Sequence, residues 1–146
     1  MVQRLLVPVD GTDLSDRAMT ASLDLARQLG VPVTGFIAEP SLPSGGARAR
    51  ALLEDEANDA DVMDEGKARL VLTEFERRAQ AAGVEFEGVH QRVPRVDRAI
   101  IEAAESRGCD LIVMVTHGRG AFGEFLFGSH TKAVMAGCKL PLLVLR

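Results

Sequence analysis

The chain has 146 residues, of which 47% are hydrophobic and 26% are charged, and these proportions are typical of one folded domain and exclude a globally disordered chain. Seventeen basic and 21 acidic side chains give a formal net charge of −4. Such a small excess disfavours a general binder of nucleic acid or of membrane surfaces, so we expect one domain over residues 1–146 that binds neither.

The first half of the chain predicts a strand, a helix and a second strand. Residues 5–9 form an apolar run without polar alternation, which is typical of a strand covered on both faces of a parallel sheet. Apolar residues at helical spacing follow over 14–29, and Gly30 stands where a helix cap is expected. Residues 31–38 predict the second strand. Turn-forming and then acidic residues fill the segment 39–66, where we expect an irregular excursion.

The second half repeats the alternation, with a third strand that is half exposed, as at a sheet edge, and a fourth that is the most apolar. The predicted elements are a helix at 68–82, a strand at 84–89, a helix at 96–104, a strand at 111–115, a helix at 129–136 and a strand at 141–145. Regular alternation of this kind predicts the α/β class, with an open twisted five-stranded parallel sheet and helices on both faces.

No apolar run is long enough to cross a membrane, because a spanning helix needs about 20 apolar residues and runs such as 111–115 and 140–145 are far shorter. The first residues show no leader pattern, so we expect a cytoplasmic protein. No cluster has the spacing of metal ligands, and a divalent cation such as Mg²⁺ is expected only as a companion of bound phosphates.

Two segments lie where such sheets bind ligands, outside the carboxyl ends of the strands near the point at which strand order reverses. One is residues 9–10 after the first strand, and the other is the glycine-rich stretch 116–129 after the fourth. Residues 118–123 match the dinucleotide pattern G-x-G-x-x-G, but the next strand ends at Arg146 without the acidic residue that a ribose needs. Residues 123–129 have the outer spacing of a P-loop but lack its lysine, which excludes a P-loop NTPase.

A more specific pattern joins Gly118, nine further residues, and then Gly128 and Ser129 at the start of a helix. Helix N-termini present free N–H groups and a partial positive charge, so residues 128–130 are candidates to hold phosphate oxygens while Gly118 lets the backbone approach them. From residue 107 to 146 there are five basic and two acidic side chains, a surplus of +3 in a chain of net −4. This arrangement suits a triphosphate.

Several segments together resemble the universal stress protein family, and the resemblance covers essentially the whole chain. The matching segments are 5–10, 109–114, 116–120, 125–129 and 140–145, with the sequences LLVPVD, CDLIVM, THGRG, FLFGS and LPLLVL. The resemblance implies a Rossmann-like domain of the adenine nucleotide alpha hydrolase-like type. It also implies a regulatory protein of the stress response that binds an adenine nucleotide, ATP or AMP.

Nucleotide-binding members of that family carry the pattern G-x2-G-x9-G-(S/T), and Gly118, Gly128 and Ser129 match its later positions. The resemblance implies that Asp10 meets the adenine, that Val9 lies alongside it, and that the residues of the loop and of the helix start hold the phosphates. The candidate nucleotide-binding residues are Pro8, Val9, Asp10, Val115, His117, Gly118, Gly128, Ser129 and His130.

The chain departs from the family at three positions. Val115 stands where the pattern has its first glycine, and its β-branched side chain adds bulk where the backbone of family members approaches the phosphates. Arg92 lies near the end of the third strand, where the family often has a glycine, and it either obstructs the site or binds phosphate. His130 occupies a usually apolar position, and we expect its protonation to tighten nucleotide binding below neutral pH.

Three candidates have a structural interpretation that stays open beside the functional one. Asp10 can tie the turn or cap the next helix through its carboxylate. Ser129 is a good helix N-cap with or without a phosphate. His117 has no acid–base partner visible in the sequence, and a hydrogen-bonded structural histidine is the more frequent case.

Three functions fit these residues: a nucleotide-binding regulatory protein, a slow ATPase and a nucleotide-free dimeric module. Dedicated catalysis is not indicated, because Glu124 is the only acid within the loop and no attacking group is apparent. The final strand is apolar, and such an edge is prone to aggregate unless something pairs with it. The resemblance implies that two copies pair through that strand, so we expect a homodimer.

Overall fold

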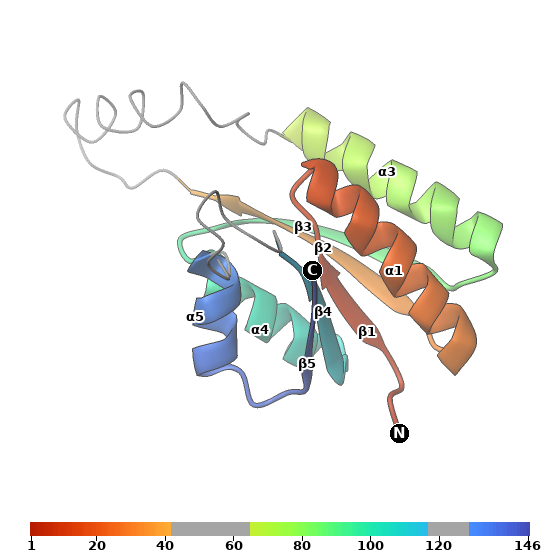
Figure 1. Ribbon diagram of the computed structural model, residues 1–146. Coiled ribbons are helices and arrows are strands. Elements are labelled where there is room, and N and C mark those ends of the chain that lie inside the picture. The colour runs from red at the N-terminus through yellow and green to blue at the C-terminus, as the bar shows by residue number, and fades with distance from the viewer. Residues whose placement is uncertain (42–64, 117–128) are drawn as a thin grey trace.

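The computed structural model describes residues 1–41, 65–116 and 129–146. Within them, five parallel strands form one sheet in the order β3-β2-β1-β4-β5 (Figure 1). The strands are β1 (Leu5–Pro8), β2 (Val33–Pro40), β3 (Phe86–Val93), β4 (Leu111–Val115) and β5 (Leu142–Leu145). The predicted α/β class is therefore confirmed, with the first and fourth strands inside the sheet and the third at an edge.

Two layers of helices enclose the sheet. The helices are α1 (Asp13–Leu29), α3 (Glu65–Ala82), α4 (Val96–Ser106) and α5 (Ser129–Gly137). Helices α1 and α3 lie on one face, and α4 and α5 lie on the other (Figure 1). As predicted, α1 ends at Gly30, which adopts a left-handed φ of 67° and donates its N–H to the carbonyl of Ala26.

Alternate residues of each strand face opposite helical layers. Leu5 and Val7 of β1 belong to a buried cluster, here called cluster 1, that lies under α1 and α3. Leu6 belongs to a second buried cluster, cluster 2, on the side of α4 and α5. All three side chains are fully buried, which explains why this run shows no polar alternation.

The second and third strands begin and end later along the chain than the sequence predicts. They continue to Pro40 and Val93, beyond the predicted ends at 38 and 89, and pair through Glu39–Arg92 and Pro40–Val93. Pro40 lacks an N–H, but no strand hydrogen bond is lost. Its backbone points toward the β1 side of β2, and β1 has already ended opposite Phe36. Pairing between distant residues therefore extends two strands through residues that look like turn formers.

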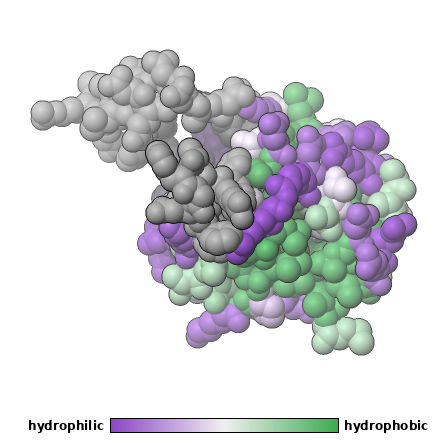
Figure 2. All heavy atoms as spheres, in the orientation of Figure 1, coloured by the Kyte–Doolittle hydropathy of each residue, from purple (hydrophilic) through white to green (hydrophobic). Residues whose placement is uncertain are grey.

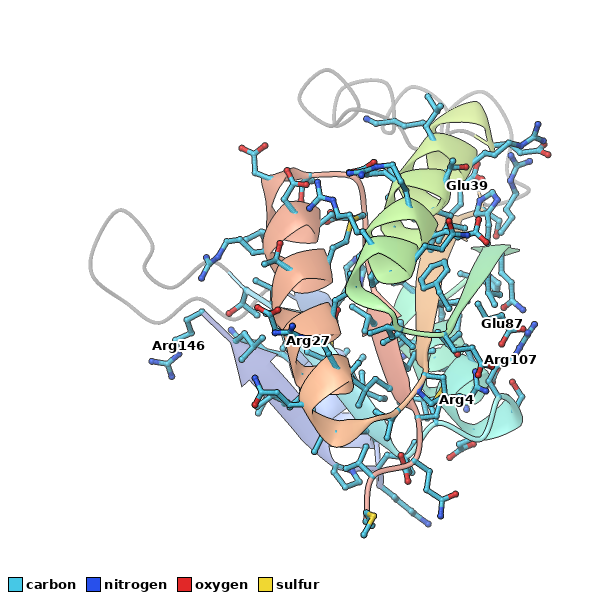
Figure 3. The ribbon with its side chains drawn as sticks, turned by 90° about the vertical axis from the view of Figure 1, so that its right-hand side faces the viewer. Arg4, Arg27, Glu39, Glu87, Arg107 and Arg146 are labelled. Carbon is cyan, nitrogen blue, oxygen red and sulfur yellow. The ribbon has the colours of Figure 1, made fainter. Side chains whose placement is uncertain are left out.

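Charged side chains gather at the amino ends of the strands, away from the edge at which such sheets bind ligands. Arg4 lies 3.9 Å from both Glu85 and Glu87, and Glu87 also pairs with Arg107 (Figure 3). Asp110 accepts hydrogen bonds from the backbone N–H groups of residues 3 and 4. Desolvation raises the pKa of Asp110, but those hydrogen bonds outweigh it and bring the pKa below its ordinary value. These contacts tie the N-terminal residues to β4.

Candidate functional site

The carboxyl ends of β1 and β4 meet at the point where strand order reverses. The chain leaves β1 toward α1 on one face, whereas α5, which follows β4, packs on the other (Figure 1). Val9 donates its N–H to the carbonyl of Phe36 at 2.9 Å, and Thr116 donates to the carbonyl of Leu145 at 2.9 Å. Asp10 and Thr116 therefore directly follow the carboxyl ends of β1 and β4, the position at which open α/β sheets bind ligands.

Asp10 is exposed at this edge, and one of its two carboxylate oxygens accepts hydrogen bonds from described residues. Its Oδ1 accepts hydrogen bonds from the Thr12 N–H at 3.0 Å, the Thr12 hydroxyl at 2.6 Å and the Ser15 hydroxyl at 3.1 Å. Oδ2 accepts none from the described residues. The turn-tying interpretation of Asp10 is thus realised through Oδ1, whereas Oδ2 faces no donor in the described part of the chain.

Ser15 closes the same turn. Its hydroxyl oxygen accepts the N–H groups of Asp10 and Gly11 at 3.0 and 2.8 Å. Gly11 has a φ of 77°, a left-handed conformation that favours glycine. Ser15 did not stand out in the sequence because it lies within the helical pattern, and only the folded turn brings its hydroxyl to Asp10.

The side chains of the two residues before Asp10 point to opposite faces of the sheet. Val9 is buried in cluster 1, with 7% of its surface exposed. Pro8 is half buried and, by alternation along β1, faces the layer of α4 and α5 together with Leu6. Contact between Val9 and a base at this edge would therefore run through its main chain.

The side chain of Val115 lies on the α1 side of the sheet. It is half buried and packs against cluster 1, on the face opposite α5. His130 is exposed in the first turn of α5, whose first residue is Ser129. His117, Gly118 and Gly128, which were also predicted to bind the nucleotide, lie outside the described residues.

Arg92 is bound to a carboxylate that the sequence did not single out. Its Nε and Nη2 donate to Oε1 of Glu39 at 3.2 and 2.8 Å, and Nε2 of His90 lies 3.0 Å from Oε2 of Glu39. The Glu39 side chain, labelled in Figure 3, is only 11% exposed. This cluster lies on the α3 side of the sheet, because Glu39 alternates with Ile37 of cluster 1. In this arrangement Glu39 holds the guanidinium of Arg92 on the face of the sheet opposite α5.

Among the described residues, no three histidine, cysteine or acidic side chains are placed to hold a metal ion. Over the same part of the chain, no helix is long and apolar enough to cross a membrane. The expected cation, a companion of bound phosphates, stays a prediction.

The sequence and the fold are similar to those of known proteins. The profile described as the universal stress protein family matches residues 1–146. A universal stress protein of Thermus aquaticus is 30% identical, and the match covers 100% of both chains. Two solved structures of universal stress proteins share the fold, one in complex with cAMP and one from Archaeoglobus fulgidus in complex with dAMP. The first is 22% identical, with a TM-score of 0.69 and coverage of 99% of this chain and 97% of the other. The second is 19% identical, with a TM-score of 0.67 and full coverage of both chains.

Proposed function

Because the chain belongs to the universal stress protein family, we propose that it is a cytoplasmic regulatory protein of the stress response that binds an adenine nucleotide, ATP or AMP, between the carboxyl ends of β1 and β4. The observation that carries this proposal is Asp10, which stands at the strand-order reversal and whose Oδ2 accepts no hydrogen bond from a described residue. That oxygen is suited to accept the N6 amino group of an adenine. The related proteins in complex with cAMP and dAMP support the choice of base.

Helix α5 supplies the second part of the proposed site. It begins at Ser129 at the carboxyl edge of the sheet, and its first N–H groups and partial positive charge favour phosphate oxygens. His130 lies exposed in the same turn. Mg²⁺ would arrive bound to the phosphates. We assign no residue to catalysis, so occupancy rather than turnover is the proposed signal.

The decisive measurement identifies the nucleotide directly. The protein is purified without added nucleotide and denatured, any released ligand is identified by mass spectrometry, and the stripped protein is titrated with ATP and AMP by calorimetry. We expect saturable binding of at least one of the two nucleotides. Absence of binding at millimolar ligand would overturn the proposal and favour the nucleotide-free dimeric module.

We also propose that two copies pair through β5. All four residues of β5 are apolar and half exposed, and Figure 2 shows an apolar surface on the side of the molecule where β5 lies in Figure 1. Pro141 and Leu145 accept hydrogen bonds from β4, so by alternation the N–H and C=O groups of Leu142 and Val144 face outward. A second copy of β5 would satisfy these groups and cover the apolar surface.

Two proline substitutions separate pairing from folding. Val144→Pro removes an outward N–H and should give a monomeric mass in sedimentation or solution scattering with the fold intact. Leu143→Pro removes an N–H that faces β4, so it should lower the free energy of unfolding by about 1–3 kcal/mol. A monomeric wild-type protein at micromolar concentration, or a dimeric Val144→Pro variant, would refute pairing through β5.

A further inference from the structure

The outer edge of β3 carries backbone groups that pair with no other strand in the described part of the chain. β3 ends the sheet, and Glu85 and Val93 accept hydrogen bonds from β2. Because the N–H and C=O of one residue point the same way along a strand, the odd-numbered residues of β3 face β2. The even-numbered residues, Phe86, Gly88, His90 and Arg92, therefore present their N–H and C=O groups outward.

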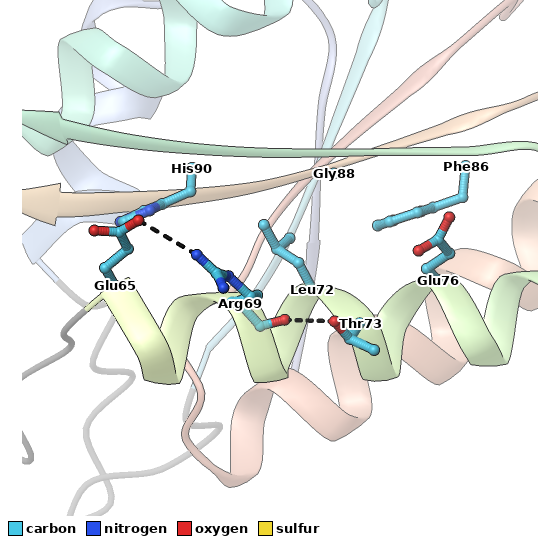
Figure 4. A pocket seen from close by; sticks show the side chains of 8 residues that line it. All are labelled: Glu65, Arg69, Leu72, Thr73, Glu76, Phe86, Gly88 and His90. Atoms are coloured by element: carbon cyan, nitrogen blue, oxygen red, sulfur yellow. Dashed lines mark hydrogen bonds and ion pairs between the residues drawn. The ribbon is translucent and has the colours of Figure 1, made fainter.

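A groove runs beside this same edge. It has a volume of about 390 Å³ and is bounded on one side by Phe86, Gly88 and His90 and on the other by one stripe of α3 (Figure 4). The groove is thus lined by three of the four residues whose backbone faces outward. It lies beside β3, two strands away from β1, so it is separate from the proposed nucleotide site.

We propose that this groove binds an extended segment of a partner protein, which adds to the sheet as a sixth strand alongside β3. An extended peptide backbone presents donors and acceptors at the same spacing as the open edge, and the helix beside the edge provides contacts for alternate side chains. This inference goes beyond nucleotide binding and would hold without it.

The centre of the groove suits a branched apolar side chain. Gly88 has no side chain, and Phe86 and Leu72 pack closely over it, since a Cβ there would lie 3.3 Å from the ring of Phe86 and 3.5 Å from the Cβ of Leu72. A partner residue opposite Gly88 can therefore approach the backbone closely and place its side chain against Leu72 and Phe86.

The charges at the two ends of the groove differ. At the end of the groove where His90 lies, Arg69 is 3.5 Å from Glu65, and His90 itself is bound to Glu39. At the other end, Glu76 stands beside the ring of Phe86 and forms no ion pair with a described residue (Figure 4). An unpaired carboxylate next to an aromatic ring favours a lysine or arginine side chain, so the partner segment should carry a basic residue at this end.

The direction of the added strand follows from pairing energetics. Antiparallel pairing is slightly more stable per residue, so the partner segment should run from His90 toward Phe86. Residues opposite His90, Gly88 and Phe86 would then have a polar, a branched apolar and a basic side chain facing α3. Intervening residues would face the layer of α4.

The probe is a five-residue peptide, Thr-Thr-Val-Thr-Lys, with blocked ends and a fluorescent label, titrated against the full-length chain. Its central valine is placed opposite Gly88, where its N–H bonds to the edge. N-methylation of that valine should weaken binding by about tenfold or more, whereas N-methylation of the fourth residue, whose N–H points away from β3, should have little effect. The reversed sequence, which has the same charge, controls for nonspecific attraction to an acidic protein.

Variants of the protein test the same contacts from the other side. Glu76→Gln should weaken binding of the lysine peptide several-fold, while Glu102→Gln, an exposed acid on α4, should not. Gly88→Val would displace Phe86 and Leu72, which pack over this position, and should abolish binding, with circular dichroism to check that the variant is folded. No binding at millimolar peptide, equal effects of the two N-methylations, or equal effects of the two glutamine substitutions would overturn the proposal.

Discussion

Replacing Asp10 by asparagine is expected to move the base preference of the protein from adenine toward hypoxanthine. The amide oxygen can keep the place of Oδ1, where Thr12 and Ser15 donate three hydrogen bonds. The amide nitrogen then takes the place of Oδ2 and presents a donor to the N6 amino group of adenine, which is also a donor. We expect the affinity for AMP to fall by about tenfold or more and the affinity for IMP, whose base has a carbonyl at that position, to rise.

Calorimetric titration of both nucleotides checks this expectation, and the matched control is Asp13→Asn. Asp13 is an exposed acid in the first turn of α1, so its substitution removes the same charge nearby without changing the Asp10 turn. Thermal unfolding should show little change for Asp10→Asn, because the contacts of Oδ1 are preserved. Unchanged affinity for AMP in the folded variant would mean that Asp10 only ties the turn.

Phe75→Ala is expected to be the most destabilising of these substitutions. Phe75 is the one large side chain of α3 that is fully buried, since the other two fully buried residues of this helix are alanines. Its ring centroid lies 4.7 Å from that of Phe86. Both rings pack over Gly35, where a Cβ would come within 2.7 Å of Phe86 and 2.8 Å of Phe75. Truncation leaves a cavity between α3 and the sheet, with an expected loss of about 3–5 kcal/mol in the free energy of unfolding.

Urea denaturation measures this loss, and Leu70→Ala on the same helix is its control. Leu70 is 72% exposed, so its truncation should change the free energy of unfolding by less than about 0.5 kcal/mol. Similar values for the two variants would show that Phe75 does not anchor α3 on the sheet. Because Phe75 supports Phe86, the same variant should also lose affinity for the peptide proposed for the α3–β3 groove.

Local sequence patterns predicted the elements better than they predicted element ends. The apolar runs at 5–9 and 111–115 were correctly placed inside the sheet, because burial on both faces leaves no polar alternation. The ends of β2 and β3 were wrong by two and four residues, because the pairing of Glu39 with Arg92 extends both strands through polar residues. Hydrophobic periodicity describes one segment at a time, so it does not predict a pairing between two distant strands.

The candidate site was predicted in part. Asp10 and the start of α5 lie at the expected edge of the sheet, because the order of strand, turn and helix along the chain determines which residues follow each carboxyl end. The positions of the Val115 and Arg92 side chains were not predictable in the same way. Val115 faces cluster 1 and Arg92 binds Glu39, and each orientation depends on which helix covers which face of the sheet.

By itself, the sequence determined the fold class, the family and the edge at which a nucleotide is expected, because apolar periodicity and short motifs are properties of neighbouring residues. Tertiary structure alone decided the cluster of Glu39, His90 and Arg92 and the open groove between β3 and α3. Those features depend on strand order and register between segments about 50 residues apart, and the interactions that set order and register are non-local.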